Sequence, residues 1–170
     1  KNVYRAAQKY AASSTRGGLY ISGPKGTGKT FLAALIAGEK LRQGIPTLFV
    51  FVPDLLDSFR KAMHDGQGDD VARTAREADF LVLDDMGAER ATAWVSEQLM
   101  ALINFRYSHQ MPTVITSNYQ LDELADHLSG SMVNRGEPDR ITGERICSRI
   151  AAMTISLRLS GQDMRLLIGG

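Results

Sequence analysis

The sequence predicts an α/β fold in which helices cover both faces of a parallel β-sheet, and three observations lead to this prediction. Short apolar runs alternate along the chain with longer segments whose apolar residues recur at helical spacing. A glycine-rich loop at residues 23–30 follows the first apolar run and precedes the first long helical segment. Two aspartates, Asp84 and Asp85, end a later apolar run. Because ligands of open α/β sheets bind at the carboxyl ends of the strands, we expect the functional site there.

Five apolar runs are expected to form the strands of the sheet. They are residues 19–21, 47–52, 80–83, 113–116 and 155–159. The runs at 47–52 and 80–83 are continuous, as in a strand that is buried on both faces. The last run alternates apolar with polar residues, which is typical of a half-exposed edge strand.

Six segments with helical spacing lie around these runs. They are residues 2–13, 31–43, 53–63, 70–79, 95–107 and 142–152. Gly44 and Pro46 stop the second segment, Pro53 opens the third, and Pro112 follows the fifth. The apolar faces that we expect to be buried are Leu55, Leu56, Phe59 and Met63 in one helix and Val95, Leu99, Leu102, Ile103 and Tyr107 in another. Residues 129–144 contain three glycines and a proline, and we expect an exposed loop there.

The composition is that of one domain of ordinary size over residues 1–170, and it excludes several classes of protein. The 20 basic and 19 acidic residues leave a net charge of +1, so no overall field attracts nucleic acid or a membrane. The one cysteine, Cys147, excludes an intramolecular disulfide, and we expect it to be a buried apolar residue. No apolar stretch is long enough to span a membrane and no signal peptide opens the chain, so we expect a cytoplasmic protein. The first residue is Lys1 instead of Met, which suggests a piece of a longer chain.

Residues 23–30 read Gly-Pro-Lys-Gly-Thr-Gly-Lys-Thr and match the phosphate-loop pattern G-x-x-x-x-G-K-[ST] between a strand and a helix. Glycines let backbone N–H groups close around phosphate oxygens, and the N-terminus of the following helix adds partial positive charge. Lys29 is expected to meet the β- and γ-phosphates of a nucleoside triphosphate, and Thr30 to offer its hydroxyl to Mg²⁺. The residues expected to bind the nucleotide are Gly23, Pro24, Lys25, Gly26, Thr27, Gly28, Lys29, Thr30 and Phe31.

The tandem aspartates form the second motif. A buried strand at residues 80–83 would deliver both carboxylates to the carboxyl edge of the sheet. Asp84 is expected to hold Mg²⁺, mostly through water, and Asp85 to orient or deprotonate the attacking water. The alternative is that two aspartates end a strand and cap a turn, and the phosphate loop upstream favours the catalytic interpretation.

Polar residues at the end of the fourth strand form the third motif, Thr116-Ser117-Asn118. The amide of Asn118 is placed to contact the γ-phosphate or to hold the lytic water, although asparagine is also common in turns. Arg145 and Arg149 form the fourth motif, because residues four apart share one face of a helix. Such arginines are usually solvated or paired with acids, but they can also be presented to the nucleotide site of a neighbouring subunit.

These motifs, in this order, resemble the AAA+ domain of DnaC/DnaI-type replicative helicase loaders over nearly the whole chain. The segments that carry the resemblance, besides the phosphate loop, are 49–56 (Phe-Val-Phe-Val-Pro-Asp-Leu-Leu), 83–89 (Leu-Asp-Asp-Met-Gly-Ala-Glu), 115–118 (Ile-Thr-Ser-Asn) and 144–149 (Glu-Arg-Ile-Cys-Ser-Arg). The resemblance implies an AAA+ P-loop core with strand order 5-1-4-3-2. It further implies that Asn118 is sensor 1, that Arg149 is an arginine finger and that Arg145 supports it.

The resemblance also implies cofactors and partners. The cofactors would be ATP and Mg²⁺, and the ATP state would promote association of subunits. A replicative helicase would be bound by a region outside residues 1–170, and the helix at 53–63 would approach single-stranded DNA. On that helix we expect Arg60 and Lys61 to contact DNA, because a net charge of +1 leaves binding to local patches. Phe59 could stack on a base, although its place on the apolar face favours the core.

The chain departs from the AAA+ pattern in two places. The second acid of the tandem is Asp85, where AAA+ proteins usually carry Glu. Because the side chain of aspartate is shorter, we expect slow ATP hydrolysis. After the fifth strand no room remains for a helical lid, so Arg165 resembles a sensor 2 arginine only loosely. We interpret the sequence as the ATPase domain of a helicase loader. The alternatives are an IstB-like transposition ATPase and an AAA+ module whose ATP state only regulates protein binding.

Overall fold

The computed structural model describes residues 2–13, 17–64, 68–129 and 140–161. Its five-stranded parallel sheet has the order β2-β3-β4-β1-β5, which confirms the predicted order 5-1-4-3-2. The strands are β1 (Gly18–Ser22), β2 (Thr47–Phe51), β3 (Phe80–Met86), β4 (Thr113–Ser117) and β5 (Thr154–Arg158). All neighbouring strands pair in parallel, so their carboxyl ends meet at one edge of the sheet.

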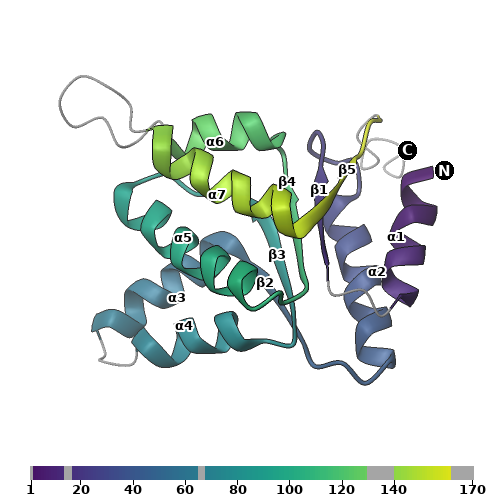
Figure 1. Ribbon diagram of the computed structural model, residues 1–170, viewed down its shortest axis with the longest axis horizontal. Coiled ribbons are helices and arrows are strands. Elements are labelled where there is room, and N and C mark those ends of the chain that lie inside the picture. Colours follow the sequence, from purple (N-terminus) through teal and green to yellow (C-terminus); the bar gives the residue numbers. More distant parts are fainter. Residues whose placement is uncertain (1, 14–16, 65–67, 130–139, 162–170) are drawn as a thin grey trace, which may run out of the picture.

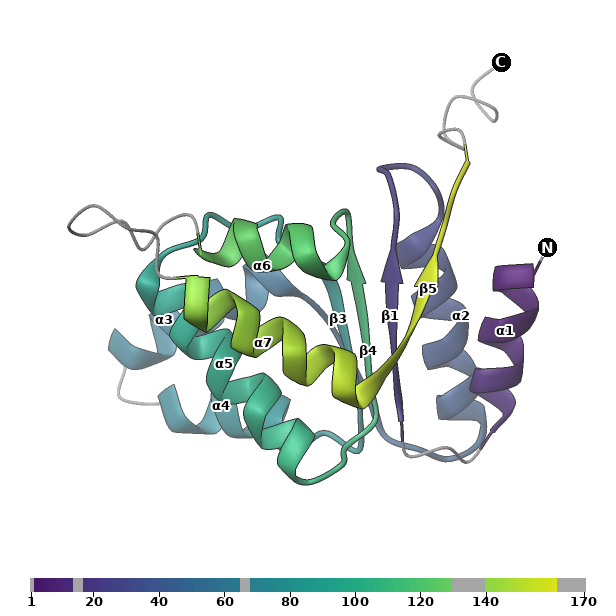
Figure 2. The ribbon, with the colours of Figure 1, turned by 45° about the horizontal axis from the view of Figure 1, so that its top comes forward.

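Helices cover both faces of this sheet, as predicted. The helices in the described residues are α1 (Asn2–Ala12), α2 (Lys29–Arg42), α3 (Val52–His64), α4 (Gly68–Glu77), α5 (Ala93–Ser108), α6 (Leu121–Ser129) and α7 (Arg140–Met153). Figure 1 shows α1 and α2 on one side of the sheet and the other five helices on the opposite side. In Figure 2, β1 and β4 point in the same direction, and the loop that joins β1 to α2 lies beyond the end of β1.

Alternate residues of each inner strand pack into opposite cores. Leu19 and Ile21 of β1 lie in the core beneath α1 and α2, whereas Tyr20 lies in the core beneath the other helices. Full burial of such apolar side chains stabilises the fold by about 1.5–3 kcal/mol each. The start of α2, where the glycine-rich loop ends, is therefore held by well-packed elements on both sides.

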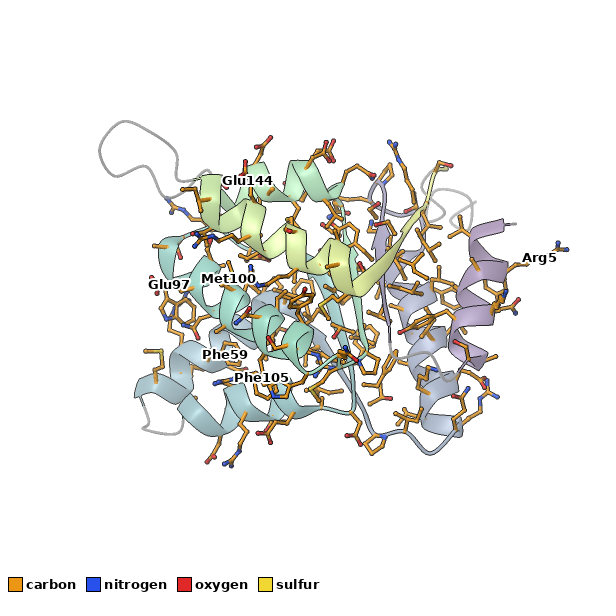
Figure 3. All side chains as sticks on the ribbon, viewed as in Figure 1. Arg5, Phe59, Glu97, Met100, Phe105 and Glu144 are labelled. Atoms are coloured by element: carbon orange, nitrogen blue, oxygen red, sulfur yellow. The ribbon has the colours of Figure 1, made fainter. Side chains whose placement is uncertain are left out.

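The face of α3 is buried largely as expected. Phe59 is 4% exposed and lies on the side of the helix that faces α5 (Figure 3), which confirms that it is a core residue. Met63 is 60% exposed and Tyr107 is 43% exposed, so the prediction that both are buried was wrong. Each lies in the last turn of its helix. At these positions the apolar spacing continues, but the described residues leave the side chains largely uncovered.

The segment after β4 differs most from the prediction. Helix α6 was missed, although Leu121, Leu124 and Leu128 have helical spacing and acids occupy its first turn. Helix α7 begins at Arg140, inside the region expected to be a loop, while residues 130–139 lie outside the described part of the chain. The missed helix matters for the site, because it begins four residues after the last residue of β4.

Candidate nucleotide-binding site

The glycine-rich loop has the backbone that a phosphate loop needs. Gly23, Gly26 and Gly28 have φ angles of 149°, 78° and 89°, a region that side chains with a Cβ rarely adopt. A Cβ on Gly23 would also lie 2.3 Å from the carbonyl oxygen of Leu159. Helix α2 begins at Lys29, so its first backbone N–H groups and the positive end of its dipole lie at the loop. The loop is built to receive an anion.

The Lys29 side chain lies beneath this loop and is only 6% exposed. Its Nζ donates to the carbonyl oxygens of Gly23 at 2.8 Å and Pro24 at 2.9 Å, and to Oδ1 of Asn118 at 2.8 Å. These acceptors place the ammonium group between the loop and the end of β4. Asn118 is thereby joined to the phosphate loop, as a side chain that senses a bound phosphate must be.

The two aspartates contact different partners. The Asp84 carboxylate accepts from the Thr30 hydroxyl at 3.0 Å through Oδ2 and from the Thr116 hydroxyl at 2.7 Å through Oδ1. Asp85 Oδ1 accepts from Nδ2 of Asn118 at 2.9 Å. Asn118 therefore bridges Lys29 and Asp85. The structure thus brings together Lys29, Thr30, Asp84, Asp85 and Asn118, which the sequence had placed on three separate segments.

A β-bulge explains how consecutive aspartates reach one site. In a regular strand, adjacent side chains point to opposite faces of the sheet. Between the pairs Leu83–Ile115 and Met86–Ser117, however, β3 has two residues where β4 has one, and the register shifts. Asp85 has a left-handed φ of 58°, which aspartate tolerates better than most residues. Asp84 therefore contacts Thr30 of the phosphate loop, and Asp85 contacts Asn118, which in turn contacts Lys29.

The pair Thr30 and Asp84 fits Mg²⁺. A hydroxyl and a carboxylate are hard oxygen ligands, and Mg²⁺ commonly takes one or two such groups together with waters and phosphate oxygens. The 3.0 Å contact between Thr30 and Asp84 shows that the two ligands lie side by side. Within the described residues no cluster of three or more His, Cys, Asp or Glu offers a metal site made of protein ligands alone.

The remaining predicted nucleotide contacts differ in their exposure. Lys25 is exposed, and Phe31 in the first turn of α2 is 66% exposed. Thr27 is buried and its hydroxyl donates to the carbonyl of Pro24 at 2.8 Å, so it shapes the loop. Arg165 lies outside the described residues.

The two arginines of α7 lie away from this network. Arg149 Nε donates to Oδ1 of Asn104 on α5 at 2.7 Å, and its Nη1 donates to the backbone carbonyl of Arg145 at 3.2 Å. Arg145 is exposed. These contacts hold Arg149 against α5 and the backbone of α7, apart from the hydrogen bonds that join Lys29, Asn118 and Asp85.

The candidate DNA contacts lie on α3. Arg60 Nη1 donates to Asp57 at 3.0 Å, and its guanidinium lies 5.0 Å from the centroid of the Trp94 ring. The Arg60 side chain is 56% exposed, and Lys61 is exposed as well. Both cations are accessible, although Arg60 is partly neutralised by its acidic neighbour.

Sequence reasoning missed two residues near the acids. Thr116 is completely buried and contacts both members of the tandem, whereas only Asn118 was chosen from its motif. Glu89 is 9% exposed, and its Oε2 accepts from the backbone N–H of Gly87 at 3.0 Å. Burial raises the pKa of Glu89, and its hydrogen bonds and His127 lower it only in part. The sequence feature that could have identified Thr116 was its position one residue beyond the apolar part of β4. Periodicity and spacing offered no such feature for Glu89.

Cys147 takes no part in this chemistry. Its side chain is 6% exposed in the core, and burial raises the pKa of the thiol to about 12. The prediction of a buried apolar residue is confirmed. No helix in the described ranges is long and apolar enough to cross a membrane.

Comparison with known proteins agrees with this geometry. Residues 11–162 match the family described as IstB-like ATP binding protein. The chain is 33% identical over 149 residues to the replicative helicase loader DnaI of Bacillus subtilis, covering 87% of this chain and 47% of DnaI. It is 29% identical over 136 residues to an ATP-binding protein of insertion sequence IS5376 from Geobacillus stearothermophilus, covering 80% of this chain and 54% of that protein. It thus spans about half the length of these curated relatives.

The fold of the chain also resembles that of a solved structure. A crystal structure of DnaI superposes with a TM-score of 0.80 at 28% sequence identity, covering 94% of this chain and 84% of that one. The parallel sheet and its strand order are those of AAA+ P-loop proteins. The chain therefore belongs to the family of IstB-like ATP-binding proteins.

Proposed function

We propose that residues 1–170 are one AAA+ domain that binds and hydrolyses ATP within a DNA replication helicase loader. The observation that carries this proposal is the continuous network from Lys29 through Asn118 to Asp85, with Thr30 and Asp84 beside it. It connects a phosphate-binding cation, a polar sensor and an acid, which are the parts that ATP hydrolysis requires. The likeness to DnaI, named a replicative helicase loader, supports the biological role.

Each residue of the network has a task that its position supports. Lys29 would neutralise charge on the β- and γ-phosphates, while Thr30 and Asp84 would hold Mg²⁺. Bound Mg²⁺ would neutralise the charge that develops on the phosphate oxygens. Asp85 would orient the attacking water, and Asn118 would link the water to the γ-phosphate position. Because Asn118 contacts both Lys29 and Asp85, loss of the γ-phosphate would change both contacts at once.

Assembly would couple this site to DNA and to a helicase. Arg149 lies on an outer surface where a second subunit could receive it, and Arg145 would support it. An arginine supplied in trans accelerates phosphoryl transfer by about a thousandfold or more. Arg60 and Lys61 would give each subunit a weak patch for single-stranded DNA, which assembly would multiply through avidity. The helicase itself would bind a region outside this chain.

An ATPase of a transposition system is the second candidate. The likeness to the ATP-binding protein of an insertion sequence supports it, and the site geometry is compatible with both roles. The two differ in partner: a loader would copurify with a hexameric replicative helicase, whereas a transposition ATPase would associate with a transposase and with duplex DNA.

The test of ATP binding compares two lysines of one loop in the full-length protein. Lys29→Ala should abolish binding of a fluorescent ATP analogue, because it removes the buried ammonium at the phosphate position. Lys25→Ala removes only an exposed side chain and keeps the backbone N–H of the loop, so it should bind nearly as tightly as the unmodified protein. Tight binding by Lys29→Ala would contradict the site.

Subunit mixing tests the arginine. Arg149→Ala and Lys29→Ala chains should each be inactive in ATP hydrolysis, and a mixture should regain part of the activity because one chain supplies the site and the other the finger. Absence of recovery in mixtures that demonstrably co-assemble would leave Arg149 with a structural contact to Asn104 only.

A further inference from the structure

We propose that Thr116 is a positioning residue whose single hydroxyl orients both aspartates and thereby sets the Mg²⁺ dependence of nucleotide binding. The proposal rests on the proposed function in so far as Mg-ATP is the ligand. It concerns a side chain that touches neither metal nor nucleotide in our assignment and acts through Asp84 and Asp85.

The bulge between β3 and β4 gives Thr116 its unusual position. It is the one residue of β4 that lies opposite two residues of β3, between the pairs Leu83–Ile115 and Met86–Ser117. Regular pairing of the two strands is interrupted at this point, so the backbone there needs another partner. The Thr116 side chain is completely buried and supplies that partner.

The hydroxyl makes two hydrogen bonds of opposite direction. It accepts from the backbone N–H of Asp85 at 2.8 Å and donates its one proton to Oδ1 of Asp84 at 2.7 Å. The first bond holds Asp85 in its left-handed conformation, with a φ of 58°. The second occupies one carboxylate oxygen of Asp84 and leaves Oδ2 directed at the hydroxyl of Thr30. A single oxygen atom therefore contacts both the backbone of Asp85 and the carboxylate of Asp84.

Replacement by valine isolates this role, since valine has the same shape but neither donates nor accepts a hydrogen bond. In Thr116→Val the buried Oδ1 of Asp84 loses a charge-assisted bond, and the N–H of Asp85 loses its acceptor. The Asp84 carboxylate is then free to rotate away from Thr30. Loss of a residue that orients a metal ligand typically weakens metal binding by about 10–100-fold. Serine keeps the hydroxyl and should keep the function.

A matched control lies on the same strand. Thr113 is also completely buried, and its hydroxyl accepts from Nε of Arg106 at 2.7 Å and donates to the carbonyl of Met111 at 3.0 Å. It lies at the amino end of β4, opposite the site. Thr113→Val therefore removes a buried hydroxyl from the same strand without touching the aspartates.

The first measurement is amide hydrogen exchange in the absence of nucleotide and Mg²⁺. The Asp85 amide should exchange at least about tenfold faster in Thr116→Val than in the unmodified chain, and at the unmodified rate in Thr116→Ser and Thr113→Val. This measurement does not depend on the ATP assignment. Unchanged exchange at Asp85 in Thr116→Val would overturn the positioning role.

The second measurement is the Mg²⁺ midpoint for binding of a fluorescent ATP analogue, with an arm in EDTA. Thr116→Val should raise the midpoint about 10–100-fold and leave binding in EDTA within about twofold, while Thr116→Ser and Thr113→Val stay within about threefold of the unmodified protein. An unshifted midpoint in Thr116→Val, or an equal shift in Thr113→Val, would overturn the inference. If the unmodified protein binds no nucleotide, the proposed function fails instead.

A second variant distinguishes the loss of the hydroxyl from a failure of the protein to fold. Thr116→Cys keeps a small side chain with a weak donor, and it should give a midpoint between those of the serine and valine variants. Should Thr116→Val not fold, a cysteine midpoint equal to that of the unmodified protein would overturn the proposal.

Discussion

The buried arginine of α5 gives the most direct test of the packing that supports the site. Arg106 is completely buried, and its guanidinium donates to five neutral oxygens. The acceptors are the hydroxyl of Thr113 and the carbonyls of Ala75, Arg76, Ala78 and Pro112, at 2.7, 3.3, 2.9, 2.9 and 2.8 Å. Burial lowers the pKa of Arg106 to about 10, so it stays charged at neutral pH. One side chain thus joins the end of α4 to the start of β4.

The change Arg106→Met keeps an unbranched apolar side chain in place of the aliphatic part of arginine and removes every donor. A buried oxygen that loses its partner costs about 1–3 kcal/mol, but some of the carbonyls at the end of α4 are only partly buried and can bind water. Counting two or three oxygens at the lower end of that range, we expect a loss of about 3 kcal/mol in the free energy of unfolding. For a domain of this size the melting temperature should fall by about 6–12 °C.

The assay is urea unfolding of the domain, followed by circular dichroism. Arg73→Met is the matched control, because Arg73 lies on α4 and is 63% exposed in a pair with Asp70. It should change stability by less than about 0.5 kcal/mol. ATP affinity at low urea should be unchanged in both variants, since neither side chain contacts the site. A loss below about 1 kcal/mol for Arg106→Met, or equal losses in both variants, would refute the reasoning.

The remaining predictions concern charges. Asp84→Asn should weaken Mg²⁺-dependent ATP binding. Asp85→Asn, in which asparagine tolerates the left-handed backbone, should preserve ATP binding and slow hydrolysis. Equal effects of the two substitutions on ATP affinity would contradict separate roles for the two aspartates. Burial raises the pKa of Glu89 in the folded chain. Above the ordinary pKa of glutamate, the unfolded chain releases this proton while the folded chain still holds it. The free energy of unfolding therefore falls as the pH rises toward the pKa of Glu89 in the folded chain. Glu89→Gln should therefore stabilise the domain more at about pH 8 than at about pH 5 in urea unfolding, and a benefit independent of pH would contradict this. Reversal of Arg60 and Lys61 to Glu should weaken salt-sensitive binding of single-stranded DNA measured by fluorescence anisotropy, and unchanged affinity would place the DNA site elsewhere.

Several features of this protein follow from the sequence because they depend on neighbouring residues. The phosphate loop was evident from eight consecutive residues between an apolar run and a helical pattern, and its glycines have the positive φ angles that this pattern requires. The positions of the strands and of most helices followed from periodicity and from proline and glycine boundaries, whereas α6 was missed. The strand order followed from the resemblance of the motifs to the AAA+ domain and was confirmed.

Only the tertiary structure decided how the site is assembled. The sequence placed Asp84 and Asp85 on one strand end, but strand alternation would have separated them, and the bulge that reunites them depends on pairing with β4, some thirty residues later. The contacts of Asn118 with Lys29 and of Arg106 with α4 likewise join residues 89 and about 30 positions apart. Local patterns are set by backbone geometry and burial within one element, whereas register and side-chain partners depend on which distant elements pack together. Apart from Thr116 and Glu89, the residues of the candidate site could therefore be named in advance, and their arrangement could not.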